Sequence, residues 1–321
     1  MGPAGVGLGM SGGTSSVRAM VIVPDIVREK ALVAGADDWL RELPATVASL
    51  EREWGIVVGG VYEGATEALV AEAVTAGGEL VVLKLCVPRD GDAARREIVA
   101  LAAAGGRSAV RLRRHDIARG VLLMERLGPS MNVVGLPLSE RQQILCDLAA
   151  AFWRPAYGLD LPNGQQKAEW LEDHILRSWE ELDRPCGERA VEHAVSCARS
   201  RASAYDVARA VLVHGDVHEW NALRRGDGWA LVDPDGLLAE PEYDLGIIMR
   251  EDPEELLHGD PRDRSRRLAA ATGLDETAIW EWGVVERVST GLLLARIGLQ
   301  PVGGQMLRAA DVIAESVTGS A

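Results

Sequence analysis

The chain has 321 residues, of which 47% are hydrophobic, and its formal net charge at pH 7 is -14. Such a length and apolar content suit a globular protein with one large domain or two medium ones. The acidic balance argues against nucleic acid or an anionic membrane as the main partner, because no excess of cations is present to neutralise phosphate. An acidic surface suits a cationic small molecule, although solubility alone explains acidity in many proteins.

The cysteines and the N-terminus give no sign of a secreted or membrane protein. No close pair and no histidine cluster is found among Cys86, Cys146, Cys186 and Cys197. We therefore expect reduced, mostly buried thiols in a cytoplasmic protein. No apolar stretch reaches the roughly 18 residues of a membrane span. Residues 1–23 are predicted to form a flexible tail, whose Gly/Ser-rich start lacks the segments of a secretory signal.

The first part of the chain is predicted to form a small sheet with leading helices. Apolar residues recur at helical spacing over 24–52, with a break expected near Pro44. Short β-rich runs follow at 55–62, 69–74 and 80–85, and two more at 110–115 and 120–124. Between them, apolar residues on one face predict a helix over 92–104. The pattern indicates a mostly antiparallel sheet with one main helix against it.

The second part is predicted to be mainly helical. Helices are expected over 139–153, 167–183 and 188–210 and again after 243, interrupted by apolar runs at 210–213 and 228–232. We therefore predict an α+β fold with an N-terminal lobe over 24–127 and a larger helical lobe over 128–321. The cleft between two such lobes is the usual place for a ligand.

The strongest chemical signal is the segment HGDVHEWN over residues 214–221, followed by LVDPDG over 231–236. Phosphoryl transfer from ATP requires a positioned acceptor hydroxyl and magnesium at the phosphates. Magnesium prefers oxygen ligands such as carboxylates and amides. Here Asp216 precedes Asn221 by five residues, and Asp233 follows after a short apolar run. This order and spacing match the base, amide ligand and metal carboxylate of kinases.

These two segments resemble the aminoglycoside phosphotransferase family, and in detail its streptomycin 6-kinase/hydroxyurea phosphotransferase branch. The likeness continues through residues 97–101, 105–112 and 122–127 and covers roughly residue 54 to the end. It implies a protein-kinase-like two-lobe fold, with a nucleotide-binding N-terminal lobe and a catalytic, acceptor-binding C-terminal lobe. It also implies ATP (or GTP) and Mg2+ as cofactors. Carried over by position, the resemblance implies that Asp216 is the catalytic base and that Asn221 and Asp233 are magnesium ligands. Taken alone, each of the three is also compatible with an ordinary turn residue.

Lys84 and Glu97 are the next candidates, for binding the nucleotide. A lysine inside the apolar run 80–85 is costly to bury unless its charge is matched. ATP phosphates and Glu97, in the following helix, would match it. The alternatives are a Lys84 that reaches solvent at a strand edge and a Glu97 on a solvated helix face.

Three further nucleotide-site residues rest mainly on the resemblance. It places the phosphate-covering loop at the turn 63–66, where Thr66 approaches phosphate; a simple hairpin turn is the alternative. In the connector, Glu125 and Leu127 are expected to line the adenine site, which backbone groups recognise.

Other residues near the motifs have open or supporting roles. Asp244 is expected to brace the catalytic loop, and a role as helix N-cap is compatible with that. His214 is expected to support the same loop through hydrogen bonds, and the same role is open to His218. Asp235 is either a solvated turn residue or a contact to metal or acceptor.

The acceptor is the least determined part of the prediction. A cationic aminoglycoside would suit acidic residues of the helical lobe, although each also suits a solvated helix face: Glu172, Asp173, Glu251, Asp252, Glu254 and Glu255. We predict a small-molecule kinase with the 6-hydroxyl of streptomycin as the favoured acceptor. The alternatives are a kinase for a sugar, amino sugar or other metabolite, a protein kinase, and a silent nucleotide-binding scaffold.

Overall fold

The computed structural model describes residues 22–89 and 91–318. Most of the predicted tail, residues 1–21, lies outside them. The N-terminal part is a five-stranded antiparallel sheet with the strand order β1-β2-β3-β5-β4. Its strands are β1 (Ile56–Val61), β2 (Ala68–Thr75), β3 (Leu80–Cys86), β4 (Leu112–Asp116) and β5 (Val121–Glu125).

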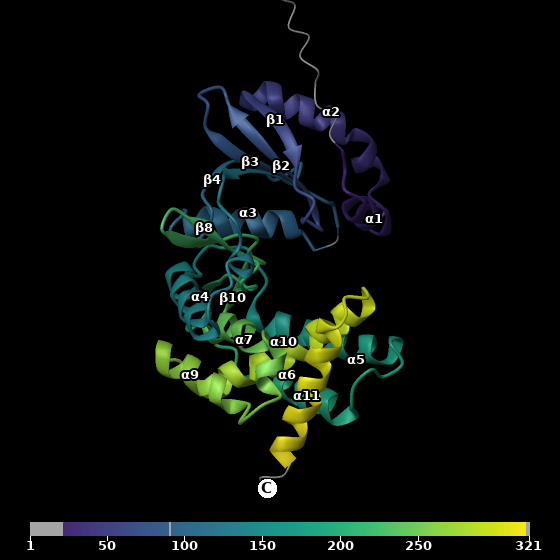
Figure 1. Ribbon diagram of the computed structural model, residues 1–321, viewed down its shortest axis with the longest axis vertical. Helices are drawn as coiled ribbons and strands as arrows, with labels where there is room; N and C mark the ends of the chain where they lie inside the picture. Colours follow the sequence, from purple (N-terminus) through teal and green to yellow (C-terminus); the bar gives the residue numbers. More distant parts are fainter. Residues whose placement is uncertain (1–21, 90, 319–321) are drawn as a thin grey trace, which may run out of the picture.

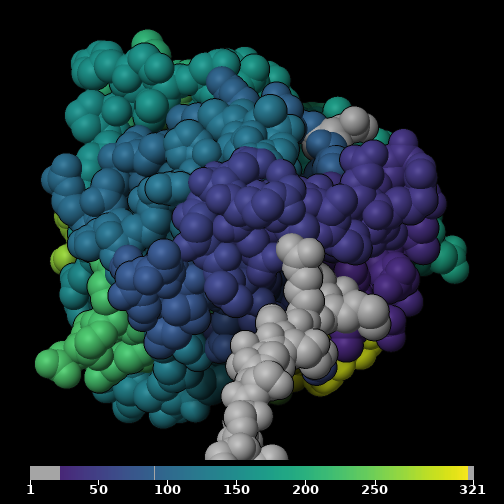
Figure 2. All heavy atoms as spheres, turned by 90° about the horizontal axis from the view of Figure 1, so that it is seen from above, coloured from purple at the N-terminus to yellow at the C-terminus, as the bar shows by residue number. Residues whose placement is uncertain are grey.

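Helices cover both faces of this sheet. Of the two leading helices, α2 (Asp37–Trp54) covers the outer face of the sheet at the top of the molecule, and α1 (Asp25–Val33) lies at its side (Figures 1 and 2). The third helix, α3 (Ala93–Ala104), lies between the sheet and the helical part of the chain (Figure 1). The predicted sheet with one main helix is confirmed.

The predicted break at Pro44 is wrong, because α2 runs through that residue. Leu43, Val47 and Leu50 form a buried stripe against the sheet. Burial of this stripe outweighs the backbone hydrogen bond that a proline cannot donate. The helical segment is interrupted earlier, at the turn between α1 and α2 around Gly35, whose φ of 68° lies in the left-handed region.

Strand β3 shows how the alternation of side chains positions the site. Leu83 and Leu85 belong to the cluster that α2 covers, whereas Lys84, between them, points to the opposite face. There the cluster shared with the helical part contains Cys86, Ile98 and Leu101. On β3, Leu83 and Leu85 therefore face α2, and the charged side chain of Lys84 faces the cleft.

The rest of the described chain is mainly helical, as predicted, with five short strands in two small sheets. A 3-10 helix over Met131–Val133 precedes its helices, which are α4 (Leu138–Phe152), α5 (Gly164–Glu181), α6 (Glu188–Ser203), α7 (Glu242–Arg250), α8 (Pro253–Leu256), α9 (Arg262–Thr272), α10 (Glu276–Arg296) and α11 (Val302–Thr318). The predicted helix over 188–210 ends seven residues earlier, at Ser203. Within residues 22–89 and 91–318, no helix combines the length and apolar character needed to cross a bilayer.

The short strands frame the two loops that carry the motif. Strands β6 (Arg154–Pro155), β7 (Val211–Val213) and β10 (Leu237–Ala239) form one small sheet, and β8 (Ala222–Arg225) pairs with β9 (Gly228–Leu231). The loop 214–221 joins β7 to β8, and the loop 232–236 joins β9 to β10. Two backbone bonds hold these loops together: Asp235 N–H donates to the carbonyl of His214, and Val232 N–H to that of Asn221.

All four cysteines are buried and none forms a disulfide, in agreement with the prediction of buried thiols.

Candidate active site

A cleft of about 760 Å³ lies between the inner face of the N-terminal sheet and the two motif loops. Its wall contains all eight residues that the sequence assigned to the site: Thr66, Lys84, Glu97, Glu125, Leu127, Asp216, Asn221 and Asp233. These residues come from both parts of the chain. The structure therefore brings the predicted residues together around one space.

Lys84 is held between two carboxylates on the sheet side of the cleft. Its Nζ lies 2.7 Å from both carboxylate oxygens of Glu97 and 2.9 Å from Oδ1 of Asp233. Burial alone would lower the pKa of Lys84, but the charges of Asp233 and Glu97 outweigh it and raise that pKa above its ordinary value. The lysine is therefore a fixed cation, and its alternative as a solvent-seeking side chain does not hold, because its side chain is 9% exposed.

Backbone geometry fixes Asp233 and connects its loop to α3. Asp233 has a φ of 57°, in the left-handed region that aspartate tolerates better than most residues. Three residues on, Gly236 has a φ of 65°, and a Cβ there would stand 2.7 Å from the carbonyl oxygen of Arg96. The loop and the helix that carries Glu97 therefore approach each other as closely as only glycine allows.

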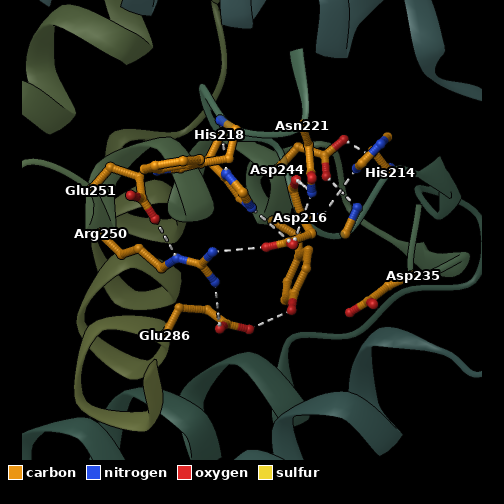
Figure 3. A network of polar contacts seen from close by, with 12 residues as sticks. His214, Asp216, His218, Asn221, Asp235, Asp244, Arg250, Glu251 and Glu286 are labelled. Carbon is orange, nitrogen blue, oxygen red and sulfur yellow. Dashed lines mark hydrogen bonds and ion pairs between the residues drawn. The ribbon is translucent and has the colours of Figure 1, made fainter. Parts of the chain in front are cut away.

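Asp216 lies at the other end of the cleft and is held by three side chains (Figure 3). Its Oδ1 accepts from Nη2 of Arg250 at 2.7 Å. Its Oδ2 accepts from Nε2 of His218 and from Nδ2 of Asn221, both at 3.0 Å. Burial would raise the pKa of Asp216, but His218 and Arg250 outweigh that effect and hold the pKa well below its usual range. Asp216 is therefore an ionised, oriented carboxylate.

Asp244 braces the loop that carries Asp216. Its carboxylate accepts from the backbone N–H groups of His214 and Gly215, at 3.0 and 2.8 Å, and from the indole of Trp153 at 2.9 Å. The predicted bracing role is confirmed. The N-cap alternative is not, because Asp244 lies inside α7 and the N-cap position is Pro241.

The two histidines of the loop support it in different ways. The ring of His214 contacts the carbonyl of Val232 through Nε2, and its Nδ1 accepts from the N–H of Asp216. The Nδ1 of His218 accepts from the N–H of Trp220, so its Nε2 carries the proton given to Asp216. Both rings thereby fix the backbone on either side of the Asp216 side chain.

The side chains of Asn221 and Asp233 fit a magnesium ion chemically. Asn221 turns its Nδ2 toward Asp216, so its oxygen is left for another partner. Asp233 is a half-exposed carboxylate in the cleft wall. Within the described residues no group of three or more His, Cys, Asp or Glu side chains could hold a metal ion. Magnesium bound by one or two protein oxygens together with nucleotide phosphates does not need such a group.

The remaining predicted residues line the nucleotide side of the cleft. The carboxylate of Glu125 turns away from it, because Oε1 accepts from the N–H of Arg111 at 2.7 Å and contacts Arg225. Oε1 of Glu125 is thereby engaged, and recognition of adenine by the backbone of this connector stays a prediction. Leu127 and Thr66 line the same wall, and the hydroxyl of Thr66 has no hydrogen bond within the described residues.

Arg250, which contacts Asp216, and Glu286, which contacts Arg250, were not predicted from the sequence (Figure 3). Arg250 ends the apolar segment of α7, and Glu286 lies in the middle of the largely buried helix α10. A charge at the end or in the middle of an apolar run was the signal that identified Lys84, and the same argument applies to both residues.

The six acidic candidates for acceptor binding mostly have partners elsewhere. Only Glu251 belongs to the network around Asp216, because it accepts from Arg250 at 2.8 Å. Asp252 pairs with Arg141, Glu255 with Arg264, and Glu172 with Arg199. Asp235, left open by the sequence, lines the cleft, and its Oδ2 lies 3.8 Å from Nζ of Lys167.

Comparison with known proteins shows which family this chain resembles. A family profile described as aminoglycoside/hydroxyurea antibiotic resistance kinase matches residues 53–298. A hydroxyurea phosphotransferase of Kitasatospora aureofaciens is 30% identical over 236 residues, which cover 71% of this chain and 68% of that protein. A streptomycin 6-kinase of Streptomyces griseus is 26% identical over 308 residues, which cover 91% of this chain and 97% of that protein.

Solved structures agree with the fold. An aminoglycoside phosphotransferase in a ternary complex with AMP-PNP and hygromycin B superposes with a TM-score of 0.59 at 15% identity, covering 85% of this chain and 98% of its own. A choline kinase of Cryptosporidium parvum has a TM-score of 0.58 at 9% identity, covering 86% and 94%. At these identities the likeness concerns the fold alone.

The family match gives the class of protein, an ATP-dependent phosphotransferase, and the two-lobe kinase-like fold agrees with it. The chain belongs to the aminoglycoside/hydroxyurea antibiotic resistance kinase family. The family and fold predicted from the sequence are thereby confirmed.

Proposed function

We propose that this protein transfers the γ-phosphoryl group of ATP to a hydroxyl of a cationic small molecule, with the 6-hydroxyl of streptomycin favoured. The observation that supports it most is the ionised Asp216 in the same cleft as the Lys84 cation and the Asn221 and Asp233 oxygens. A streptomycin 6-kinase of Streptomyces griseus is among the relatives that this chain matches over most of both lengths. Donor and acceptor sites of a kinase must meet in one such space.

Each residue has a distinct task in the proposed site. Lys84 holds nucleotide phosphate, and Glu97 keeps Lys84 in place. Thr66, Leu127 and the backbone of Glu125 line the nucleotide, with GTP as the other possible donor. Asn221 and Asp233 would hold magnesium, which would supply positive charge to neutralise the phosphates.

Asp216 acts on the acceptor. It orients the acceptor hydroxyl toward the γ-phosphorus and takes the hydroxyl proton late in the transfer. A bond forms between the acceptor oxygen and the γ-phosphorus, and the bond from that phosphorus to the bridging oxygen of ADP breaks. The products are a phosphate ester and ADP, and the proton leaves Asp216 for solvent. Positioning supplies most of the rate in such a step.

Hydroxyurea is the second candidate acceptor, because the chain is 30% identical to a hydroxyurea phosphotransferase over 71% of its length. It is uncharged and offers a hydroxyl on nitrogen. Another metabolite, such as a sugar or amino sugar, is the third candidate, since kinases of this fold act on unrelated acceptors.

The test is an ADP-release assay with Mg·ATP or Mg·GTP and a panel of acceptors: streptomycin, hydroxyurea, kanamycin, glucosamine, glucose and choline. We expect turnover with streptomycin, and we expect Asp216→Ala to reduce it by about three orders of magnitude. Nucleotide affinity, measured by calorimetry with an ATP analogue, should change little.

The proposed acceptor and the proposed role of Asp216 can fail separately. Turnover with hydroxyurea or a metabolite alone would keep the mechanism and reject streptomycin. Near-normal turnover of Asp216→Ala would remove that residue from the mechanism, and nucleotide binding without turnover on any acceptor would favour a silent scaffold.

A further inference from the structure

Arg250 forms the closest charged contact of Asp216, and neither the motif nor the proposed chemistry gives it a role. Its Nη2 donates to Oδ1 of Asp216 at 2.7 Å, and its side chain is only 10% exposed. It does not line the cleft but stands behind the carboxylate (Figure 3). The question is whether this contact only neutralises charge or also determines how Asp216 meets an acceptor.

A count of hydrogen bonds shows which oxygen of Asp216 an acceptor can use. A carboxylate oxygen has two lone pairs. Oδ2 already accepts two bonds, from His218 and Asn221, whereas Oδ1 accepts only the bond from Arg250. Within the described residues, the remaining lone pair of Asp216 is therefore on Oδ1. An acceptor hydroxyl must bind on the side that Arg250 defines.

Arg250 is itself fixed by side chains. Its Nε donates to Glu251 at 2.8 Å, and its Nη1 donates to Glu286 at 3.4 Å. The other oxygen of Glu286 accepts from the hydroxyl of Tyr243. Three of the five N–H donors of the guanidinium are thus engaged with three different carboxylates. A planar guanidinium held in this way cannot turn without breaking an ion pair.

The helix that carries Arg250 is fixed as well. The carbonyl of Met249, next to Arg250, accepts from both Arg264 and Arg287, which are buried. Helices α7 and α10 also approach closely, since a Cβ on Gly246 would stand 2.3 Å from Cβ of Trp282. Arg250 is therefore mounted on a rigid pair of helices rather than on a loop.

We propose that Arg250 is the positioning residue of Asp216: it holds Oδ1 so that one lone pair faces the acceptor hydroxyl. This inference rests on the proposed function of Asp216. Arg250 acts through the carboxylate and takes no proton. Without it, the carboxylate keeps its contacts to His218 and Asn221 but can rotate about them, and the acceptor hydroxyl loses its fixed angle of approach.

The first experiment replaces Arg250 by methionine, which fills similar space without charge, and by lysine. We expect Arg250→Met to lower kcat by about 10- to 100-fold, the cost of a small misplacement of a reacting group. Affinity for an ATP analogue should stay unchanged, and Arg250→Lys should recover part of kcat, because an ammonium can still reach Oδ1. An unchanged or higher kcat in Arg250→Met would overturn the proposal.

A matched control separates positioning from stability. Arg201 has a side chain that is 12% exposed and pairs with the two carboxylates of Glu240 and Glu281, none of which lines the cleft. Arg201→Met should lose a similar amount of thermal stability without the fall in kcat. Equal falls in kcat in both variants would show that Arg250 serves only the fold.

A double-mutant cycle with Asp216→Asn tests whether Arg250 acts through Asp216. We expect Arg250→Met to have no further effect in the Asp216→Asn background, because the group that it positions is gone. The same fold reduction in both backgrounds would overturn the proposal. If the wild type turns over none of the acceptors, the proposed acceptor is wrong. The double-mutant cycle is then run on the slow hydrolysis of ATP, in which Asp216 would orient the attacking water. The same two results, no further effect or an equal reduction, support or overturn the proposal.

Discussion

Two charged clusters each contribute a central side chain to the cleft wall, Lys84 in one and Asp216 in the other, and their arrangements are opposite. On the sheet side a cation, Lys84, lies between the carboxylates of Glu97 and Asp233. On the helical side a carboxylate, Asp216, lies between Arg250 and His218. Lys84 is thus held by two carboxylates, and Asp216 is held by a guanidinium and by the N–H group of a histidine ring. A phosphate and a hydroxyl would each meet a side chain that is already charged and oriented.

The clusters also differ in how much of the fold they need. Lys84 and Glu97 are 13 residues apart and meet because α3 follows β3 across the sheet. Asp216 and Arg250 are 34 residues apart, and Glu286 lies a further 36 away on α10. The Lys84–Glu97 pair depends on one strand and one helix, and Asp233 joins it from the loop after β9. The second cluster depends on a loop and two packed helices. Disturbances of α7 and α10 should therefore affect the acceptor step and leave the nucleotide step intact.

Replacement of Lys84 by methionine should give the largest effect that separates the clusters. We expect kcat/KM for ATP to fall about 100- to 1,000-fold, as when one charge-stabilising donor is lost from a reaction site. The KM for the acceptor should stay within about twofold, because Lys84 does not contact the Asp216 cluster. Steady-state kinetics with each substrate varied in turn is the measurement.

The control for Lys84 is Arg95→Met, which removes an exposed cation from α3 that pairs with Asp160 outside the cleft. It should leave both kinetic constants unchanged. A rise of the acceptor KM in Lys84→Met equal to the loss for ATP would contradict the separation of the two clusters.

Gly236 lies where the loop of Asp233 meets α3, and its replacement by alanine should give an intermediate effect. A Cβ at Gly236 would stand 2.7 Å from the carbonyl oxygen of Arg96, so α3 or the loop must shift. We expect a loss of about 1 to 3 kcal/mol in the free energy of unfolding and a fall in kcat/KM for ATP of about tenfold or more. Urea denaturation and the same kinetics measure both.

Gly226→Ala is the matched control, because Gly226 also has a positive φ, of 56°, but nothing lies within 4 Å of a Cβ there. It shares the backbone strain without the contact. If both variants lose the same stability and activity, the strain of φ and not the approach of α3 explains the result.

The sheet-side cluster could be predicted from the sequence because its signal is local. A lysine inside the apolar run of β3 has to find a partner, and the next helix offers Glu97. The alternation of β3 also gives the face on which Lys84 lies. The motif loops were equally visible, since Asp216, Asn221 and Asp233 stand at the spacing of a known chemistry.

The support of Asp216 could be predicted only in part, because the apolar runs around Arg250 and Glu286 indicate that both are buried but not that they support Asp216. Arg250 and Glu286 have no fixed spacing from the motif, and their meeting depends on how α10 packs on α7. The continuity of α2 through Pro44 was missed for a similar reason: burial of Leu43 and Val47 against the sheet outweighs a local preference. Tertiary packing determines both features, and spacing along one chain does not record it.

The smallest predicted effect concerns His214, whose ring contacts the backbone of both motif loops. Burial lowers the pKa of His214 to about 4, from an ordinary value of 6.5. The geometry agrees, because Nδ1 accepts from the N–H of Asp216 and Nε2 faces the carbonyl of Val232, which together require the neutral ring.

The sign of the pH dependence follows from this shift. As the pH falls from about 6.5 toward about 4, the unfolded chain binds a proton at His214 and the folded protein does not, so stability decreases across that window. We expect His214 to account for about 1 to 3 kcal/mol of the loss between these limits.

His214→Asn, whose side-chain oxygen can still accept from the N–H of Asp216, should lower stability at pH 7 and show a smaller decrease toward pH 5 in urea denaturation. The other buried histidines and the carboxylates titrate in both proteins, so the difference between them isolates His214. Parallel pH profiles would mean that this ring already binds its proton in the folded protein, and the hydrogen bond that it accepts from the Asp216 backbone would then not be what shapes the loop.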